Sequence, residues 1–287
     1  MSLIEQPLVS ICIPTYNGEE YLEEALYSAI NQSYKNIEIV ITDDQSKDRT
    51  VEIVNKIKST TNIPIYLHIH KPEGIGENWN YSVRKSNGEY IKFLFQDDLL
   101  HETCVEKLLK PFLINKKMGL SFCRREILFN KDDIFNKNWV SRFKELHINW
   151  SKINYMQEGK TLLKDKGFLS EPRNKVGEPT CVLLKKEVFN TVGYFRKDLK
   201  QSLDYEYWYR VFKKFDVGFV DEELIAFRLH ANQTTAKNSK IEISDYELYP
   251  KLVYKNLFWY LHPTLQKILF YKYNRLGKIY KKLRSYV

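Results

Sequence analysis

Two pairs of adjacent aspartates are the first groups in this sequence that could do chemistry. Asp43 and Asp44 follow one apolar run, and Asp97 and Asp98 follow another. Carboxylate oxygens accept hydrogen bonds from polar ligands and are the ligands that hard divalent cations prefer. Acidic loop residues are usually only solvated, but ligands of open α/β sheets bind beyond the carboxyl ends of the strands. The position of both pairs after strand-like runs therefore predicts a binding site.

A second set of polar groups comes from the region after residue 200. Asp204 lies near the start of a predicted helix and could act as a general base, although it could equally stabilise the helix N-terminus. Arg228 and His230 alternate on a predicted strand, so their side chains point the same way. Arginine suits a diphosphate through its fork geometry, and histidine is a hydrogen-bond donor or a metal ligand. A single histidine is, however, more often structural.

The elements that must position these groups follow from the hydrophobic pattern. Apolar runs typical of buried strands alternate with segments of helical periodicity, and later short strands follow the helix over 202–215. The expected strands are 9–13, 37–41, 65–69, 90–95, 182–184, 217–220 and 227–230. This alternation predicts an α/β fold with a doubly wound, mostly parallel sheet. Residues 101–176 carry no motif.

Composition narrows the class of protein. The chain has 287 residues, of which 43% are hydrophobic and 28% charged, as in a soluble globular domain. Its four cysteines are far apart and match no metal-ligand spacing, so we expect buried reduced thiols. No apolar stretch approaches the roughly 18 residues that a membrane span needs. We therefore expect a cytoplasmic protein, with peripheral attachment to the inner face of the plasma membrane as a second possibility.

The order of the motifs resembles the family 2 glycosyltransferases of the GT-A fold, over about residues 7–235. The motifs are Val9–Asn17, Glu38–Thr50, Asn80, Gln96–Asp98, Asp204–Arg210 and Arg228–His230. The resemblance implies inverting transfer of a sugar from a nucleotide diphosphate sugar, expected to be a UDP-sugar, with Mn2+ or Mg2+. It further implies a glycan or lipid-linked acceptor and a role in cell-surface polysaccharide synthesis.

The resemblance also assigns residues to roles. Asp204 is the expected catalytic base, and Asp98 and His230 are the expected metal ligands, with Asp97 facing the ribose. The expected donor-binding residues are Pro14, Tyr16, Asn17, Asp44, Asn80, Asp97 and Arg228, and the expected acceptor contacts are Glu178 and Thr180.

One of these donor contacts keeps an alternative interpretation: Tyr16 could stack on the nucleobase, as the resemblance implies, or be a turn aromatic. Asp44 could accept the N3–H of uracil, which the resemblance also implies. Its neighbour Asp43 could have no role beyond capping the following turn. Two positions depart from the family pattern: Gln96 and Leu203 stand where acidic residues are usual.

The net charge of +9 is confined to one end of the chain. Residues 251–287 contain nine lysines and arginines and no acidic residue, whereas residues 1–250 are balanced. We therefore divide the chain into a nucleotide-binding half (1–100), an acceptor half (101–235) and a basic aromatic helical tail (236–287). The tail could be a helix pair with solvated lysines or an anchor on an anionic membrane surface. A neutral body with a basic tail argues against nucleic acid as the partner.

Three other functions compete with the glycosyltransferase interpretation. A catalytically degenerate GT-A scaffold that binds glycan or membrane would explain Gln96 and Leu203. A nucleotidyltransferase would need a Gly-rich basic loop where Pro14 and Tyr16 stand. A nucleic-acid binder would rest on the tail alone.

Overall fold

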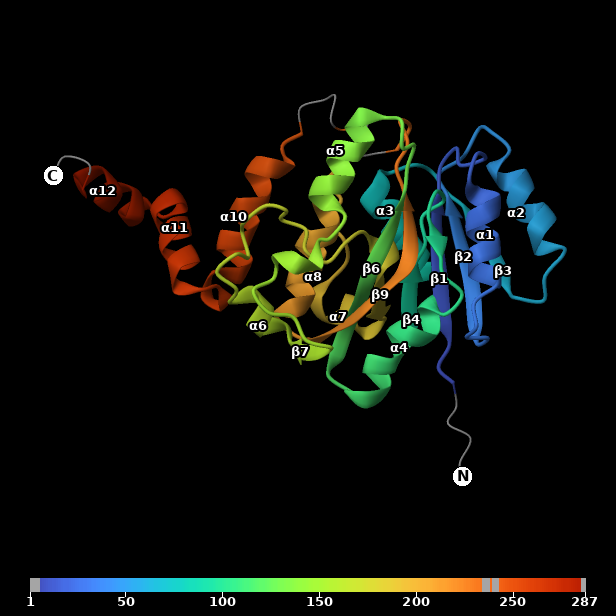
Figure 1. The fold of residues 1–287 in the computed structure, drawn as a ribbon, viewed down its shortest axis with the longest axis horizontal. Coiled ribbons are helices and arrows are strands. Elements are labelled where there is room, and N and C mark those ends of the chain that lie inside the picture. Colours follow the sequence, from blue (N-terminus) through green and yellow to red (C-terminus); the bar gives the residue numbers. More distant parts are fainter. Residues whose placement is uncertain (1–5, 234–237, 239–242, 285–287) are drawn as a thin grey trace.

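The computed structural model describes residues 6–233, 238 and 243–284. One sheet runs through the molecule, with strand order β3-β2-β1-β4-β8-β6-β9-β5 and β7 paired to β9 (Figure 1). The strands are β1 (Val9–Thr15), β2 (Ile37–Asp43), β3 (Ile65–Ile69), β4 (Tyr90–Phe93), β5 (Leu99–Leu100), β6 (Met118–Leu128), β7 (Met156–Glu158), β8 (Val182–Lys185) and β9 (Asp216–Arg228). β1 to β4 are parallel to one another, and β8 pairs antiparallel with both β4 and β6. The predicted α/β fold with a mostly parallel sheet is confirmed.

Helices connect and cover these strands. They are α1 (Leu22–Ile30), α2 (Thr50–Lys58), α3 (Ile75–Lys85), α4 (Cys104–Ile114), α5 (Ile134–Phe143), α6 (Gly159–Leu163), α7 (Glu187–Val192), α8 (Leu203–Phe212), α10 (Asp245–Leu257), α11 (Pro263–Tyr273) and α12 (Arg275–Arg284). Short 3-10 helices lie at His147–Asn149, Pro179–Cys181 and Phe258–Tyr260. α1 shows the local logic: Leu22, Ala25, Leu26 and Ala29 recur at helical spacing and are all buried.

The second half of the sheet differs from the sequence-based expectation. The runs 217–220 and 227–230, expected as two strands, belong to the single strand β9 or follow directly after it. Its parallel partner β6 comes from the region in which the sequence offered no motif. The pairing of β6 with β9 has register shifts around Cys123 and Arg124. These irregularities break the simple apolar pattern and hide one long strand.

The predicted tail divides into two parts. α10 belongs to the body: Tyr249 packs on Tyr205 of α8 with ring centroids 4.7 Å apart, and the buried carboxylate of Asp245 accepts hydrogen bonds from the backbone N–H groups of Lys200, Gln201 and Ser202. α11 and α12 project from the end of the molecule opposite to α2 and β3 (Figure 1). Among the helices described, none has the length and apolar character needed to cross a membrane.

Candidate functional site

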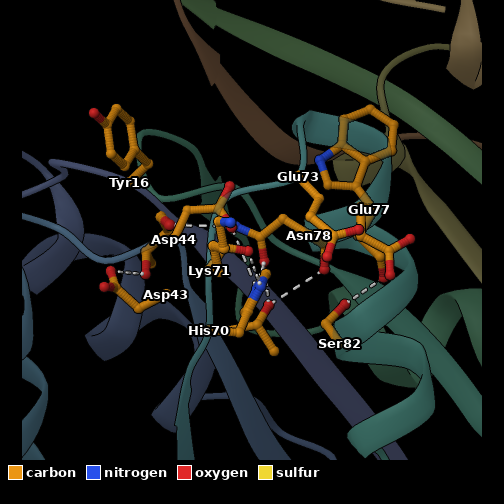
Figure 2. Close-up of polar contacts among 12 residues, drawn as sticks. Tyr16, Asp43, Asp44, His70, Lys71, Glu73, Glu77, Asn78 and Ser82 are labelled. Atoms are coloured by element: carbon orange, nitrogen blue, oxygen red, sulfur yellow. Dashed lines mark hydrogen bonds and ion pairs between the residues drawn. The ribbon is translucent and has the colours of Figure 1, made fainter. Parts of the chain in front are cut away.

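The first part of the site lies where β1 and β2 end side by side. The parallel register pairs Thr15 with Asp43, so the residues that follow, Tyr16 and Asp44, emerge at the same edge of the sheet. The side chain of Tyr16 is 55% exposed, and its ring stands clear of the polar group below it (Figure 2). An exposed aromatic ring next to a carboxylate is the arrangement that can stack on a base and read its edge.

Asp43 is buried, and its carboxylate is bonded to its own turn and to β1. Its Oδ1 accepts from the Ser46 N–H at 2.7 Å, and its Oδ2 accepts from the hydroxyls of Ser46 at 2.5 Å and Thr15 at 2.8 Å. Asp43 is therefore the capping residue of the turn after β2, as the alternative interpretation of this residue holds.

Asp44, by contrast, keeps a free acceptor. Its buried Oδ1 lies 3.3 Å from His70 Nε2, yet it makes no hydrogen bond with any described residue. Burial is the main cause that raises the pKa of Asp44, and the neighbouring His70 opposes it. Because an unpaired buried carboxylate oxygen is costly, this atom is suited to a donor group on a ligand.

Two neighbours of Asp44 escaped the sequence interpretation. Figure 2 shows His70 and Asn78 beside Asp44, with His70 Nε2 3.2 Å from Asn78 Oδ1. The Asn78 amide also donates to the Thr15 carbonyl at 3.3 Å, which ties α3 to the end of β1. His70 follows directly after β3, so the rule that pointed to the ends of β2 and β4 would have found it.

The loop after β1 is held by side chains that do not face a ligand. Asn17 has a left-handed backbone (φ 48°), and its side-chain oxygen accepts from the Lys47 N–H at 2.8 Å. Gln96 accepts from the Tyr16 N–H at 2.9 Å and donates to the Tyr16 carbonyl at 3.2 Å. An aspartate could not make the second bond, which gives the departure at position 96 a structural reason. Pro14 is buried within β1, opposite Thr42.

The two residues of the second aspartate pair also differ in their surroundings, but here the second residue is the enclosed one. Asp98 has no exposed surface; its Oδ2 accepts from the Thr180 hydroxyl at 2.7 Å and its Oδ1 from the Arg228 N–H at 3.1 Å. Burial, followed by the charge of Asp97, raises the pKa of Asp98 well above its usual value. This placement argues against the expected role of Asp98 as a metal ligand. It also removes Thr180 from the expected acceptor contacts, because that side chain is buried and bonded to Asp98.

Asp97 is the member of the pair that faces the site. Its Oδ2 lies 2.9 Å from His230 Nε2, and its backbone carbonyl accepts from Arg228 Nε at 3.0 Å. Three residues singled out in the sequence are thus brought together, and Arg228 and His230 reach the same aspartate as their alternation predicts. The first turn of α1 completes the group: the Arg228 guanidinium lies 4.5 Å from the centroid of the Tyr21 ring and 2.6 Å from a Glu24 oxygen.

The third part of the site is built around Asp204 at the start of α8. Its Oδ2 accepts from the Asn174 amide at 2.8 Å and its Oδ1 from the Tyr205 N–H at 2.7 Å. Burial is the main cause that raises the pKa of Asp204 to about 8, with the nearby charge of Glu178 adding to the shift. A carboxyl with a pKa near the working pH is well matched to general-base catalysis.

Glu178 links this part of the site to the rest. Its carboxylate pairs with the guanidinium of Arg125, which is buried and lies 5.4 Å from the Trp139 ring centroid and 5.3 Å from that of Phe227. Its charge raises the pKa of both Asp98 and Asp204. The segment around Glu178 contacts both aspartates through its neighbours: the Thr180 hydroxyl donates to Asp98, and the Asn174 amide donates to Asp204 and to the Gly177 carbonyl. Arg125, Trp139 and Asn174 all come from the region without motifs, and no sequence signal pointed to them.

Asn80 is not brought into this group. Its side-chain oxygen accepts from the Phe195 N–H at 2.9 Å, and its amide donates to the Phe195 carbonyl at 2.9 Å. The residue is buried and serves as a clamp between α3 and the loop before α8. Both ends of its amide are bonded to the Phe195 backbone, which argues against the expected contact with the donor.

The site can offer a metal ion two protein ligands at most. Within the described part of the chain, no group of three or more His, Cys, Asp or Glu residues could hold a metal. Asp97 and His230 are adjacent, with His230 Nε2 2.9 Å from Asp97 Oδ2, so these two atoms are the pair that one ion could share. Mg2+ is often held by one or two carboxylates together with substrate phosphates, so this donor set fits an ion that arrives with a diphosphate.

The sequence and the fold both have recognisable relatives. Residues 10–193 match the profile of the family described as Glycosyl transferase family 2. An uncharacterized glycosyltransferase of Rickettsia typhi is 30% identical over 243 residues, which cover 84% of this chain and 70% of the relative.

Solved structures give the same picture at lower identity. TarS of S. aureus, crystallised with UDP-GlcNAc, has a TM-score of 0.63 at 16% identity, with 92% of this chain and 71% of that chain covered. A mannosyltransferase from Pyrobaculum calidifontis, in complex with GDP-Man and Mn2+, has a TM-score of 0.58 at 17% identity, with 90% and 64% covered. At these identities the likeness establishes the fold alone.

Proposed function

The chain belongs to glycosyl transferase family 2, and we propose that it transfers a sugar from a UDP-sugar to a glycan or lipid-linked acceptor with inversion at the anomeric carbon. The fold is that of the GT-A glycosyltransferases. The observation that carries the proposal is Asp204 at the start of α8. Its carboxyl is bonded to the Asn174 amide, which also donates to the carbonyl of Gly177 beside Glu178, and its pKa is raised to about 8.

The nucleobase end supports a uridine nucleotide. Tyr16 offers an exposed ring for stacking, and Asp44 offers a carboxylate oxygen without a partner among the described residues. Uracil carries an N3–H donor on the edge that such an oxygen would meet. The same oxygen makes no hydrogen bond with any described residue but lies 3.3 Å from His70 Nε2, a contact that would keep the carboxylate in place.

The reaction is a direct displacement. The acceptor hydroxyl oxygen bonds to the anomeric carbon while the bond from that carbon to the β-phosphate oxygen breaks. Asp204, in its ionised form, takes the proton of the hydroxyl, and UDP leaves with the bonding electron pair. Because a single displacement enters opposite to the leaving group, the configuration inverts. A base in hydrogen-bond reach of the acceptor typically contributes about 10²- to 10⁴-fold in rate.

The diphosphate end uses Asp97, His230 and Arg228. Arg228 is fixed by Asp97, Glu24 and the ring of Tyr21, so its charge is held in place before the donor binds. When bound, Mn2+ or Mg2+ would neutralise charge on the diphosphate as it leaves. Asp97 and His230 are the residues that would hold the ion, in place of the expected pair of Asp98 and His230.

The acceptor side is formed by Glu178, Asp204 and Asn174. Glu178 is fixed by Arg125 and is partly exposed, so one of its oxygens can hold an acceptor hydroxyl near Asp204. A glycan or lipid-linked acceptor fits a role in cell-surface polysaccharide synthesis, and a lipid-linked one would place the reaction at the inner face of the plasma membrane.

The degenerate-scaffold alternative is not favoured. The two departures that suggested it have structural explanations: Gln96 binds the backbone of Tyr16, and Leu203 is buried in the core at the start of α8. Asp97, Asp204 and His230 are all present in the site despite these two departures.

Calorimetric titration with UDP, GDP, CMP and dTDP, each with and without Mn2+, tests the proposal. We expect UDP to bind most tightly, with Mn2+ strengthening its binding. Asp97→Asn should lose the metal effect, whereas the exposed α2 substitution Glu52→Gln should retain it. Binding of none of the four nucleotides to folded protein would overturn the proposed donor, and UDP binding indifferent to Mn2+ would overturn the proposed metal.

A further inference from the structure

The last helix, α12, carries an apolar row that faces away from the protein. Leu276 is 70% exposed, Ile279 51% and Leu283 63%. Positions three and four residues apart lie on one side of a helix, so these three side chains form one row. α12 contacts α11 elsewhere, where Gly277 lies against Phe270 and the rings of Tyr271 and Tyr280 stack with centroids 5.8 Å apart.

Basic residues flank this row. Arg275, Lys278 and Lys281 lie on the other sides of the same helix, and all three are exposed. The combination of an apolar row with a basic polar face is typical of helices that lie in the interfacial plane of a membrane.

A second exposed apolar group lies nearby in the chain. Trp259, between α10 and α11, is 83% exposed, the largest exposed fraction of any large hydrophobic side chain in the described residues. Tryptophan is favoured at membrane interfaces, because its ring is apolar and its N–H is polar. Figure 1 shows that the α11–α12 extension stands away from the body, so a flat surface could approach it without meeting the sheet.

Charge identifies which kind of surface would cover the row. Residues 251–287 hold nine lysines and arginines and no acidic residue, while residues 1–250 are balanced. A second copy of the extension would bring like charges together, which opposes self-association. The phosphate backbone of a nucleic acid would match the charge but leave the leucine and isoleucine side chains in water. An anionic bilayer satisfies both the charge and the row.

We propose that the α11–α12 extension docks on the surface of an anionic lipid bilayer, with α12 in the headgroup plane and Leu276, Ile279 and Leu283 directed toward the acyl chains. A ten-residue helix is about 15 Å long, half the thickness of the hydrocarbon core, so it lies on the membrane. The docking itself is independent of the proposed reaction; only its use, to hold the active site beside a lipid-linked acceptor, rests on the proposed function.

Vesicle co-sedimentation of the full chain tests the docking. We expect binding to vesicles of phosphatidylcholine mixed with phosphatidylglycerol, little binding to phosphatidylcholine alone, and a loss of binding in high salt. The double variants Leu276→Ser/Leu283→Ser and Lys278→Gln/Lys281→Gln should each lower the vesicle affinity roughly tenfold or more. The matched controls Ile148→Ser and Lys116→Gln, exposed on the body, should bind as the unchanged chain does.

Two further measurements separate the possible outcomes. Sedimentation velocity without lipid would reveal a dimer. A dimer that the Leu276→Ser/Leu283→Ser variant abolishes would overturn the proposal, because a second copy of the chain would then cover the row. Equal binding to both vesicle types, or unchanged binding by the row variant, would overturn it as well. UDP binding, measured on each sample, should be the same in all of the tail variants. A sample that binds UDP but not vesicles would contradict the docking and leave the proposed function standing. A sample that binds vesicles but not UDP would contradict the proposed donor and leave the docking supported.

Discussion

The proposed nucleobase end and the proposed reaction centre, in which we include the diphosphate end, both contain an aspartate pair, and the two pairs are arranged in opposite order. At the end of β2 the first residue, Asp43, is bonded to its own turn, and the second, Asp44, keeps a free oxygen. After β4 the second residue, Asp98, is enclosed by Thr180 and Arg228, and the first, Asp97, faces the site. Two acidic neighbours therefore do not form one functional unit.

The difference comes from the distance over which each pair finds its partners. Asp43 is held mainly by Ser46, three residues away, so a turn fixes it. Asp98 is held by residues 82 and 130 positions away, which only the complete fold brings together. The proposed nucleobase end is built from elements early in the chain, β1, β2, β3 and α3, whereas the proposed reaction centre depends on β8, β9 and α8 being in place.

The largest expected effect is at Asp204, the residue that most distinguishes the reaction centre. Asp204→Asn removes the proposed base but retains an oxygen of similar shape, so we expect turnover to fall about 10²- to 10⁴-fold with UDP affinity unchanged. Single-turnover transfer assays with calorimetry on the same sample would measure both. Turnover equal to that of an exposed control such as Asp132→Asn would remove Asp204 as the base.

The next largest effect is expected at Asp97 and Asp98, whose substitutions should change different properties of the protein. Asp97→Asn should weaken the Mn2+-supported binding of UDP by roughly 10- to 100-fold, because a ligand of the ion is lost. Asp98→Asn should instead lower the free energy of unfolding by about 1–3 kcal/mol, because asparagine offers one acceptor oxygen where the Thr180 hydroxyl and the Arg228 N–H now use two. Urea unfolding and calorimetry of both variants would check this. A metal-binding defect in Asp98→Asn without a loss of stability would restore the expected assignment.

The raised pKa of Asp204 predicts how the reaction centre responds to pH. A base must be deprotonated, so kcat/KM should rise about tenfold per pH unit below a pKa of about 8 and level off above it. The folded state binds the Asp204 proton more tightly than the unfolded state, so this group stabilises the protein at low pH and loses that contribution as pH rises through about 8.

The same linkage gives a second measurement. Asp204→Asn should be more stable than the unchanged chain at pH 8, and this difference should shrink toward pH 5, as thermal unfolding would record. A difference that does not vary with pH would contradict the raised pKa.

The smallest expected effect is at the nucleobase end. Asp44→Asn exchanges the free carboxylate oxygen for an amide that can still accept one hydrogen bond, so we expect KM for the UDP-sugar to rise by up to about tenfold with kcat nearly unchanged. Steady-state kinetics with Asp43→Asn as the neighbouring comparison would test it. A large fall in kcat for Asp44→Asn would break the separation between the two ends of the site.

The sequence by itself determined the first four strands, the aspartate pairs at the ends of two of them, and α8 with Asp204 near its start. These depend on hydrophobic period and on turn residues within a few positions, which are local properties of the chain. It also located the entire positive charge excess in the last 37 residues.

Only the tertiary structure decided which aspartate of each pair is available, and that Thr180 and Asn80 are structural. It alone joined Arg125, Trp139 and Asn174 to the site and made α10 part of the body while α11 and α12 project. The reason is that a buried polar group takes the partner that the fold brings within about 3 Å, and partners such as Asp97 and His230 lie 133 residues apart in the chain. A sequence pattern specifies which groups can bond, but the packing of the strands selects which of them do.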